Sequence, residues 1–426
     1  MLLVVGIAGL PLARRNRAAP IWLIALPMVW WVWQVVAGFQ TVDSALSKAT
    51  LEYFSAVIAC FYLGFFCLSR LQPLWHFWIW VVCAFGLVLA VGWEQHFGGL
   101  EDSKNYFFQY MYGKMQNIPP ELIKKFSSTR IFSTLFYPNS LAGALLLFLP
   151  ATLMLIWRMN RLLTSGARLF LIAVVGAAAL GCLFWSGSKG GWLLMLVLGL
   201  LVLLRLPLTS QVKTALVAGA IVVGLAGFLL KYAGFFEKGA TSVSARFDYW
   251  QAAARTAYSN PAFGTGPGTF AIPYLKLKRK ESEMSRLVHN DYLEQASDSG
   301  FIGLVSYAAF IIGALTWSYR KIAPGLWTAA TVAGPSERDE SPDSGHGKRK
   351  RTPKASEQGS GIADLTEKWL EADSWLPFAV WLGVLGWSLQ CLLEFSLYIP
   401  ALSWPAFAFL GWLLAQTPED APLSRG

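Results

Sequence analysis

The amino-acid sequence predicts an all-α fold, a polytopic integral membrane protein with about 11–12 transmembrane helices and one large loop outside the membrane. Composition is the first observation: 55% of the 426 residues are hydrophobic, only 14% are charged, and the mean hydropathy is +0.46. Soluble domains carry about 25% charged residues. The second observation is that the apolar residues form long runs separated by short polar connections.

Ten apolar runs approach the roughly 20 residues that a helix needs to cross a hydrocarbon core about 30 Å thick. They lie at 21–39, 49–68, 75–93, 140–157, 169–185, 191–204, 214–230, 301–317, 376–393 and 401–414. A shorter run at 1–12 is followed by Arg14, Arg15 and Arg17. It is a tilted helix, a signal sequence or the remnant of a truncated start, and the position of the basic residues after the run disfavours a signal peptide.

The short connections predict the orientation, because Lys and Arg favour the cytoplasmic side. One alternating set of connections contains Arg14, Arg15, Arg17, Arg70, Arg158, Arg161, Arg168, Arg205, Lys213, Arg320 and Lys321. The opposite short connections contain little beyond Lys48 and Lys189. We therefore place the first set inside, so that the polar segments 94–139, 186–189 and 231–300 emerge together outside.

These features divide the chain into three parts. Residues 1–230 form the N-terminal transmembrane helices, 231–300 form the large outer loop, and 301–426 form the C-terminal transmembrane helices. Within the last part, 334–361 is rich in Ser, Pro, Gly and charge. Its low hydrophobicity predicts a disordered cytoplasmic loop.

The net charge of +10 does not indicate nucleic-acid binding, because the basic residues are scattered among loops and no nucleic-acid module is recognisable. In the outer loops, Lys and Arg outnumber the acids, which suits phosphates or anionic glycans; a face turned to solvent or lipid headgroups is the alternative. The five cysteines lie in apolar segments, so neither disulfides nor a cysteine metal site is indicated.

Five polar motifs follow one another on the predicted outer side. They are Arg130 with 137–142 (YPNSLA), 186–191 (SGSKGG), 246–250 (RFDYW), 261–270 (PAFGTGPGTF), and 289–293 (HNDYL) with Gly300 and Gly303. Each is weak alone, since Pro-Asn pairs and Gly-rich turns are common. Their order and spacing over about 130–395 resemble the O-antigen ligase and polymerase superfamily.

The resemblance implies a function and its partners. Members of this family are glycosyltransferases of the bacterial inner membrane that act at its periplasmic face on undecaprenyl-diphosphate-linked glycans. It therefore implies that 231–300 is a periplasmic loop, that the acceptor is lipid A-core or another glycan, and that no cofactor is needed.

Glycan transfer from a lipid diphosphate requires cations and a base. The acceptor hydroxyl loses a proton as it attacks the anomeric carbon, while negative charge builds on the departing phosphates. Many glycosyltransferases hold a divalent metal with an Asp-x-Asp pair, and no such pair occurs in the outer loops. We therefore expect a metal-free mechanism in which Arg and Lys hold the diphosphate.

Three basic residues are the candidate diphosphate ligands. Arg246 is the first choice, because a guanidinium binds phosphate through a bidentate fork and stays charged; an interfacial anchor beside Trp250 is the alternative. Lys189 stands where the family usually carries an Arg after a Ser-x-Ser run, and it offers a point charge without that fork. It could instead extend to lipid headgroups. Arg130 adds a further contact to the donor.

His289 is the candidate general base, since an unperturbed imidazole titrates near pH 6.5; a surface histidine is the alternative. Asp248, Glu294 and Asp298 are nearby carboxylates that could orient His289 or an arginine. The glycines of 264–268 are expected to form a tight turn, either close to the substrate or purely structural, because no βαβ unit surrounds them.

The predicted function is ligation of O-antigen to lipid A-core. An O-antigen or exopolysaccharide polymerase and a protein O-oligosaccharyltransferase are alternatives of the same chemical class. A membrane transporter is the alternative from a different class. Its site would lie near the bilayer midplane on broken helices or buried charges, whereas the polar motifs here collect at one face.

Overall fold

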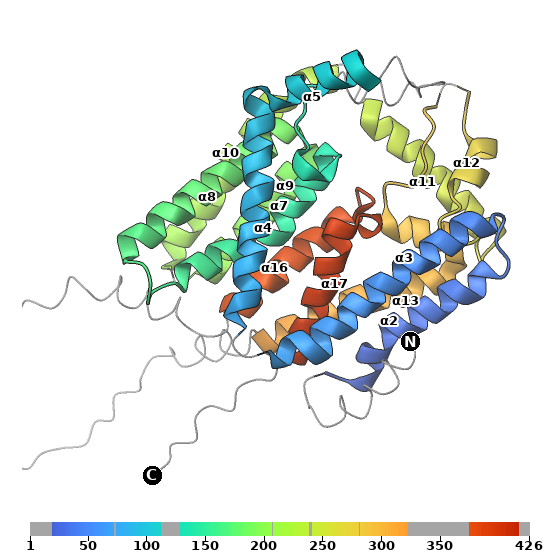
Figure 1. The fold of residues 1–426 in the computed structure, drawn as a ribbon, viewed down its shortest axis with the longest axis horizontal. Coiled ribbons are helices and arrows are strands. Elements are labelled where there is room, and N and C mark those ends of the chain that lie inside the picture. The colour runs from blue at the N-terminus through green and yellow to red at the C-terminus, as the bar shows by residue number, and fades with distance from the viewer. Residues whose placement is uncertain are drawn as a thin grey trace, which may run out of the picture.

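The computed structural model describes residues 19–71, 74–111, 128–206, 208–237, 241–280, 282–322 and 375–416. These residues form helices and no strands, which confirms the all-α class (Figure 1). The apolar run predicted at 1–12, its three arginines and the cytoplasmic loop predicted at 334–361 lie outside the described residues.

Each of the ten remaining predicted spans coincides with a helix. These helices are α2 (Ile21–Gly38), α3 (Ser44–Tyr62), α4 (Trp75–Glu94), α7 (Pro138–Trp157), α8 (Ser165–Ser186), α9 (Lys189–Arg205), α10 (Ser210–Glu237), α13 (Asp291–Ile322), α16 (Trp375–Gln390) and α17 (Pro400–Ala415). Within the described ranges, seven helical segments are long and apolar enough to cross a membrane, which confirms a polytopic membrane protein. The helices α9, α16 and α17 are shorter, with 17, 16 and 16 residues.

Shorter helical segments connect or extend these helices. They are η1 (Leu63–Cys67), η2 (Leu68–Arg70), η3 (Gln95–Gly99), α5 (Leu100–Tyr106), η4 (Phe107–Met111), η6 (Ser133–Leu135), α11 (Thr241–Ser259), α12 (Ala271–Leu277) and η7 (Ser396–Tyr398). Thus the polar segment 231–300, read from the sequence as a loop, is largely helical. Its apolar residues Tyr249, Phe270 and Tyr274 form a small core of their own.

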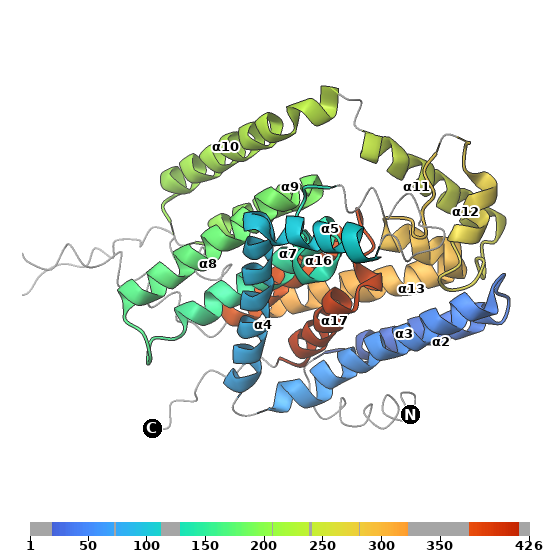
Figure 2. The ribbon, with the colours of Figure 1, turned by 45° about the horizontal axis from the view of Figure 1, so that its top comes forward.

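The centre of the bundle is formed by α7, α16 and α17, with α3, α4, α8 and α13 around them (Figure 1). Small residues allow these helices to approach closely, as is usual where lipid supplies no hydrophobic drive for helix association. A Cβ atom on Gly383 of α16 would collide with the backbone oxygen of Leu147 in α7, and one on Gly411 of α17 would collide with Phe61 in α3. In contrast, α10 lies on the outside, beyond α9 (Figure 2).

The helix α13 is broken near its N-terminal end, at Ser299 and Gly300, where Gly300 has φ +70° and ψ −173°. A helix break exposes backbone groups that need partners. The segment 261–266 supplies them: Phe301 N–H donates to Pro261 O over 2.8 Å, and Gly266 N–H donates to Asp298 O over 2.8 Å. The glycine-rich motif therefore supplies hydrogen-bond partners for the backbone at the break in α13.

Candidate functional site

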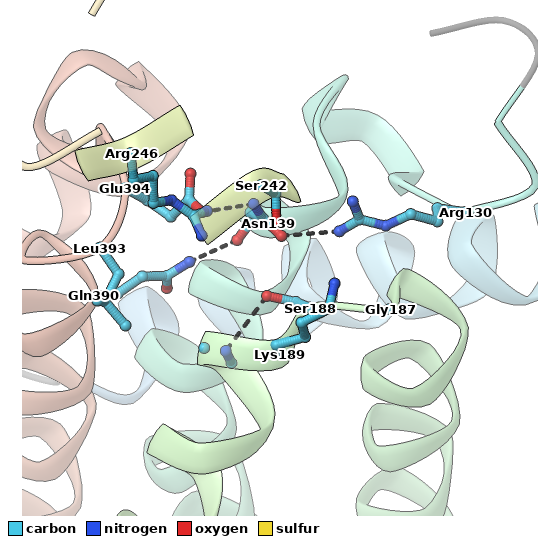
Figure 3. Close-up of a pocket in the computed structure, with 12 residues that line it drawn as sticks. Arg130, Asn139, Gly187, Ser188, Lys189, Ser242, Arg246, Gln390, Leu393 and Glu394 are labelled. Atoms are coloured by element: carbon cyan, nitrogen blue, oxygen red, sulfur yellow. Dashed lines mark hydrogen bonds and ion pairs between the residues drawn. The ribbon is translucent and has the colours of Figure 1, made fainter. Parts of the chain in front are cut away.

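A cavity of about 480 Å³, including its open mouth, lies where α7, α9 and α11 begin and α16 ends (Figure 3). Three of the four predicted site residues line it, namely Arg130, Lys189 and Arg246. The fourth, His289, reaches the cavity wall through a contact with Glu394, which also lines the cavity. Residues up to 264 positions apart in the sequence thus form one site.

The start of each of three helices contributes to the cavity lining. Asn139 belongs to the first turn of α7, Ser188 and Lys189 begin α9, and Ser242 belongs to the first turn of α11. The first N–H groups of a helix have no acceptor within it, and the helix dipole places partial positive charge there. The cavity is therefore electropositive for two independent reasons, its cationic side chains and its helix ends.

Arg130 is held in place by two neutral acceptors. Its Nε donates to Ser186 O over 2.6 Å, and its Nη2 donates to the Oδ1 of Asn139 over 2.8 Å. Burial lowers the pKa of the Arg130 guanidinium, and the nearby charge of Glu394 acts to raise it. An arginine remains charged under such shifts. Arg130 therefore lines the cavity as a positively charged side chain that two hydrogen bonds hold in place.

Lys189 takes its position from the turn that joins α8 to α9. Gly187 ends α8 in the left-handed region with φ +61°, packed against Arg130, and the Ser188 hydroxyl accepts from Gly191 N–H over 3.3 Å to cap α9. The Lys189 Nζ lies 5.2 Å from the ring centroid of Tyr232, a cation–π distance. The side chain belongs to the cavity lining, and the SGSKGG motif is explained by this turn.

Glu394 is the central residue of the site, and the sequence motifs did not identify it. Its Oε1 accepts from Arg246 Nη2 and, over 2.5 Å, from Asn139 Nδ2. Its Oε2 lies 3.1 Å from His289 Nδ1. One carboxylate therefore joins the candidate phosphate ligand Arg246 to the candidate base His289. Figure 3 shows Glu394 beside Arg246 and Asn139.

The three carboxylates suggested by the sequence as partners of His289 make other contacts. Asp248 accepts from the Ser282 hydroxyl, Glu294 from Val288 N–H and Asp298 from Gly268 N–H. The carboxylate on His289 is instead Glu394, which lies 105 residues further along the chain. One signal could have identified it: Glu394 is the single charged residue between 375 and 416, and an isolated charge among transmembrane segments marks a functional candidate.

The surroundings of Glu394 determine its protonation. Burial acts to raise the pKa of this carboxyl, but the hydrogen bond from His289 and the positive charges of Arg246 and Arg130 outweigh burial, so the pKa lies below its usual value. An ionised carboxylate only accepts hydrogen bonds, so His289 Nδ1 carries the hydrogen. In the neutral ring, Nε2 is then the nitrogen with a free lone pair.

The backbone and the rings around His289 fix the direction of the imidazole. His289 has φ +55°, a left-handed conformation that is uncommon for a residue other than glycine. Its ring lies between Tyr249, at a centroid distance of 5.7 Å, and Phe395, at 4.8 Å. Strained backbone conformations persist where the surroundings over-determine them and are concentrated at functional sites.

The site contains cations where a metal enzyme would need anionic ligands. Among the described residues, no three His, Cys, Asp or Glu side chains are grouped in a way that could hold a metal ion. The side chains around the cavity combine three basic groups with one carboxylate that is already bound to Arg246, Asn139 and His289. This arrangement is suited to binding an anion.

Residues 176–308 match a family model described as O-Antigen ligase. The matched segment begins in α8 and ends in α13, and it includes Lys189, Arg246 and His289. A comparison with curated proteins finds no match. Arg130 and Glu394 lie outside the matched segment and complete the same cavity.

Proposed function

We propose that this chain, which carries the O-antigen ligase family domain at residues 176–308, is a metal-independent glycosyltransferase of the bacterial inner membrane. It moves a glycan from an undecaprenyl-diphosphate donor to an acceptor hydroxyl at the periplasmic face. The acceptor is lipid A-core, so the reaction is O-antigen ligation. The observation that carries the proposal is the cavity in which three basic side chains and three helix N-termini adjoin an imidazole held by a carboxylate.

In this proposal the diphosphate binds among Arg130, Lys189 and Arg246. The bond from the anomeric carbon to the diphosphate oxygen breaks, and its electron pair leaves with the diphosphate. Positively charged donors around that oxygen stabilise the charge as it develops, and removing one such donor typically costs about 10²–10³ in rate. Fixed cations also avoid the cost of reorganising water around the leaving group.

His289 serves the other half of the reaction. Its Nε2 takes the proton of the acceptor hydroxyl as that oxygen bonds to the anomeric carbon. The ring becomes an imidazolium, and Glu394 stabilises it through Nδ1 over 3.1 Å. The carboxylate has two tasks, since it fixes the tautomer before the reaction and balances the charge during it.

The placement of the cavity supports access by both substrates. It lies at the ends of α7, α9 and α16 that the charge pattern assigns to the periplasm, next to the 231–300 segment. We propose that the lipid donor enters from the bilayer and the acceptor from the aqueous side. The 1–230 and 301–426 parts then provide the membrane frame, and 231–300 provides the periplasmic part that carries Arg246 and His289.

The test is glycan transfer by the purified protein in EDTA, with undecaprenyl-diphosphate glycan and a lipid A-core acceptor. We expect the wild type to transfer glycan, and the variants His289→Ala and Arg246→Ala to lose about 10²-fold or more of the rate. The matched controls are His96→Ala and Arg255→Ala, an exposed histidine before α5 and an exposed arginine on α11 outside the cavity. Both controls should retain wild-type rates.

The products separate the proposed reaction from its alternatives. Lengthened glycan on undecaprenyl diphosphate with unmodified lipid A-core would identify a polymerase, and glycan on protein hydroxyls would identify a protein O-oligosaccharyltransferase. Loss of activity in EDTA with recovery on adding a divalent ion would contradict the metal-independent mechanism. Absence of transfer to every acceptor, with movement of a solute across vesicles, would favour transport.

A further inference from the structure

Beside the site, α13 carries three buried carboxylates on one face: Asp291, Glu294 and Asp298 are at most 1% exposed. Their spacing of three and four residues places them on one helical stripe. Each accepts a hydrogen bond from the backbone N–H of a different segment, at Leu397, Val288 and Gly268 respectively. The first turns of α13 thus hold three separate loops.

Two of these loops carry His289 and Glu394, the two residues that contact each other at the site. Glu294 Oε2 accepts from Val288 N–H over 3.1 Å, and Val288 directly precedes His289 with its left-handed backbone. Asp291 Oδ2 accepts from Leu397 N–H over 2.8 Å, while Asp291 N–H donates to Cys391 O over 2.7 Å. These two bonds fix the chain three residues before and three residues after Glu394.

We propose that Glu294 and Asp291 are positioning residues that set the contact between His289 and Glu394. Neither side chain lines the cavity, and both are fully buried. Glu294 holds the loop of His289, Asp291 holds the loop of Glu394, and the rigid turn of α13 between them fixes the distance between the two loops. For this role each side chain needs an oxygen that accepts the backbone hydrogen bond; it does not need a negative charge.

The third carboxylate is a natural control. Asp298 Oδ2 accepts from Gly268 N–H over 2.7 Å, on the same helix and with the same burial. The segment that it holds, 264–270, contributes no side chain to the cavity. Loss of Asp298 should therefore cost stability like loss of Glu294, without displacing His289.

The first readout does not depend on activity. In histidine-labelled protein, which contains four histidines, the ¹⁵N spectrum identifies the His289 ring by its absence from a His289→Gln sample. We expect the Nδ1-protonated tautomer in the wild type and in Asp298→Ala, and a mixture of tautomers in Glu294→Ala and Asp291→Ala. A single Nδ1-protonated form in every variant would overturn the proposal.

The second readout is the kinetics of glycan transfer, which rests on the proposed function. Per folded molecule, Glu294→Ala should lower kcat by about 10- to 100-fold with little change in the donor KM, because a misplaced base slows chemistry without weakening binding. Asp298→Ala should leave kcat within about threefold of the wild type. Equal kcat values for Glu294→Ala and Asp298→Ala would contradict the positioning role.

The isosteric variants Glu294→Gln and Asp291→Asn keep a carbonyl acceptor and remain informative if the alanine variants do not fold. We expect both to retain kcat, its pH profile and the His289 tautomer. A loss in these folded variants would mean that the charge acts directly, against the proposal. An inactive wild type with the expected tautomer pattern would refute the proposed function alone.

Discussion

Glu394 controls the electrostatics of the site through one carboxylate. Its two oxygens bind Arg246, Asn139 and His289, so protonation would disturb the candidate phosphate ligand and the candidate base together. The lowered pKa protects against this, because the carboxylate stays ionised at pH values where an ordinary glutamic acid begins to take up a proton. The site should therefore be intact down to mildly acidic pH.

The lowered pKa makes a prediction about stability. A carboxyl whose folded pKa lies below its unfolded value of about 4.3 contributes stability that is complete above that value and is lost as the pH falls through the folded pKa. The difference in Tm between wild type and Glu394→Gln, measured in detergent, should shrink as the pH falls below about pH 4. Exposed Glu52 provides the control variant Glu52→Gln. A difference that does not shrink below about pH 4 would disprove the assignment.

Lys189 is expected to act through its positive charge at the start of α9. Lys189→Ala should raise the donor KM by about 10- to 100-fold, the equivalent of one hydrogen bond to a charged group, and Lys189→Arg should restore most of the affinity. Steady-state kinetics with varied donor concentration measure both effects. Lys276→Ala, on the exposed face of α12, removes an equal charge away from the cavity and should leave KM unchanged. Equal effects of the two alanine variants would show that only the general surface charge matters.

At the scale of elements, the transmembrane helices were predictable, because an apolar segment that crosses lipid must satisfy its own backbone hydrogen bonds, as a helix does. The helical character of 241–259 was missed because the segment is polar overall, and its core of Tyr249, Phe270 and Tyr274 joins residues that lie apart in the sequence. Arg130, Lys189, Arg246 and His289 could be selected as candidates from their motifs. Glu394 could not be linked to them, because its partnership depends on packing between segments far apart in the sequence.

The contact of the glycine-rich segment 261–266 with the break in α13 leads to a prediction at the same scale. Gly266 has φ +107°, and a Cβ there would collide with Thr41 in the α2–α3 connection. Gly266→Ala should therefore destabilise the protein by about 1–3 kcal/mol, seen as a lower Tm in detergent, with unchanged transfer per folded molecule. Gly219→Ala, at a position of α10 with open space around it, should be neutral or slightly stabilising. A neutral Gly266→Ala would contradict the structural role of the motif.

At the scale of the whole molecule, the charge pattern predicts which side of the membrane the cavity faces. The connection between α7 and α8 contains Arg158 and Arg161 and is expected in the cytoplasm, while His96 is expected on the periplasmic side with the cavity. A membrane-impermeant maleimide should label His96→Cys in spheroplasts and Arg161→Cys only after lysis. The wild type, whose five cysteines lie in apolar segments, gives the background. The reverse pattern would place the cavity in the cytoplasm and remove access to a periplasmic acceptor.

The central claim is that His289 and Glu394 act as one unit beside the bound diphosphate, and a double-mutant cycle tests it most directly. Transfer rates would be measured in EDTA for wild type, His289→Ala, Glu394→Ala and the double variant. Because residues that act as a unit are strongly non-additive, we predict that the double variant loses far less activity than the product of the two single losses. Losses that multiply, or full activity in His289→Ala, would contradict the account.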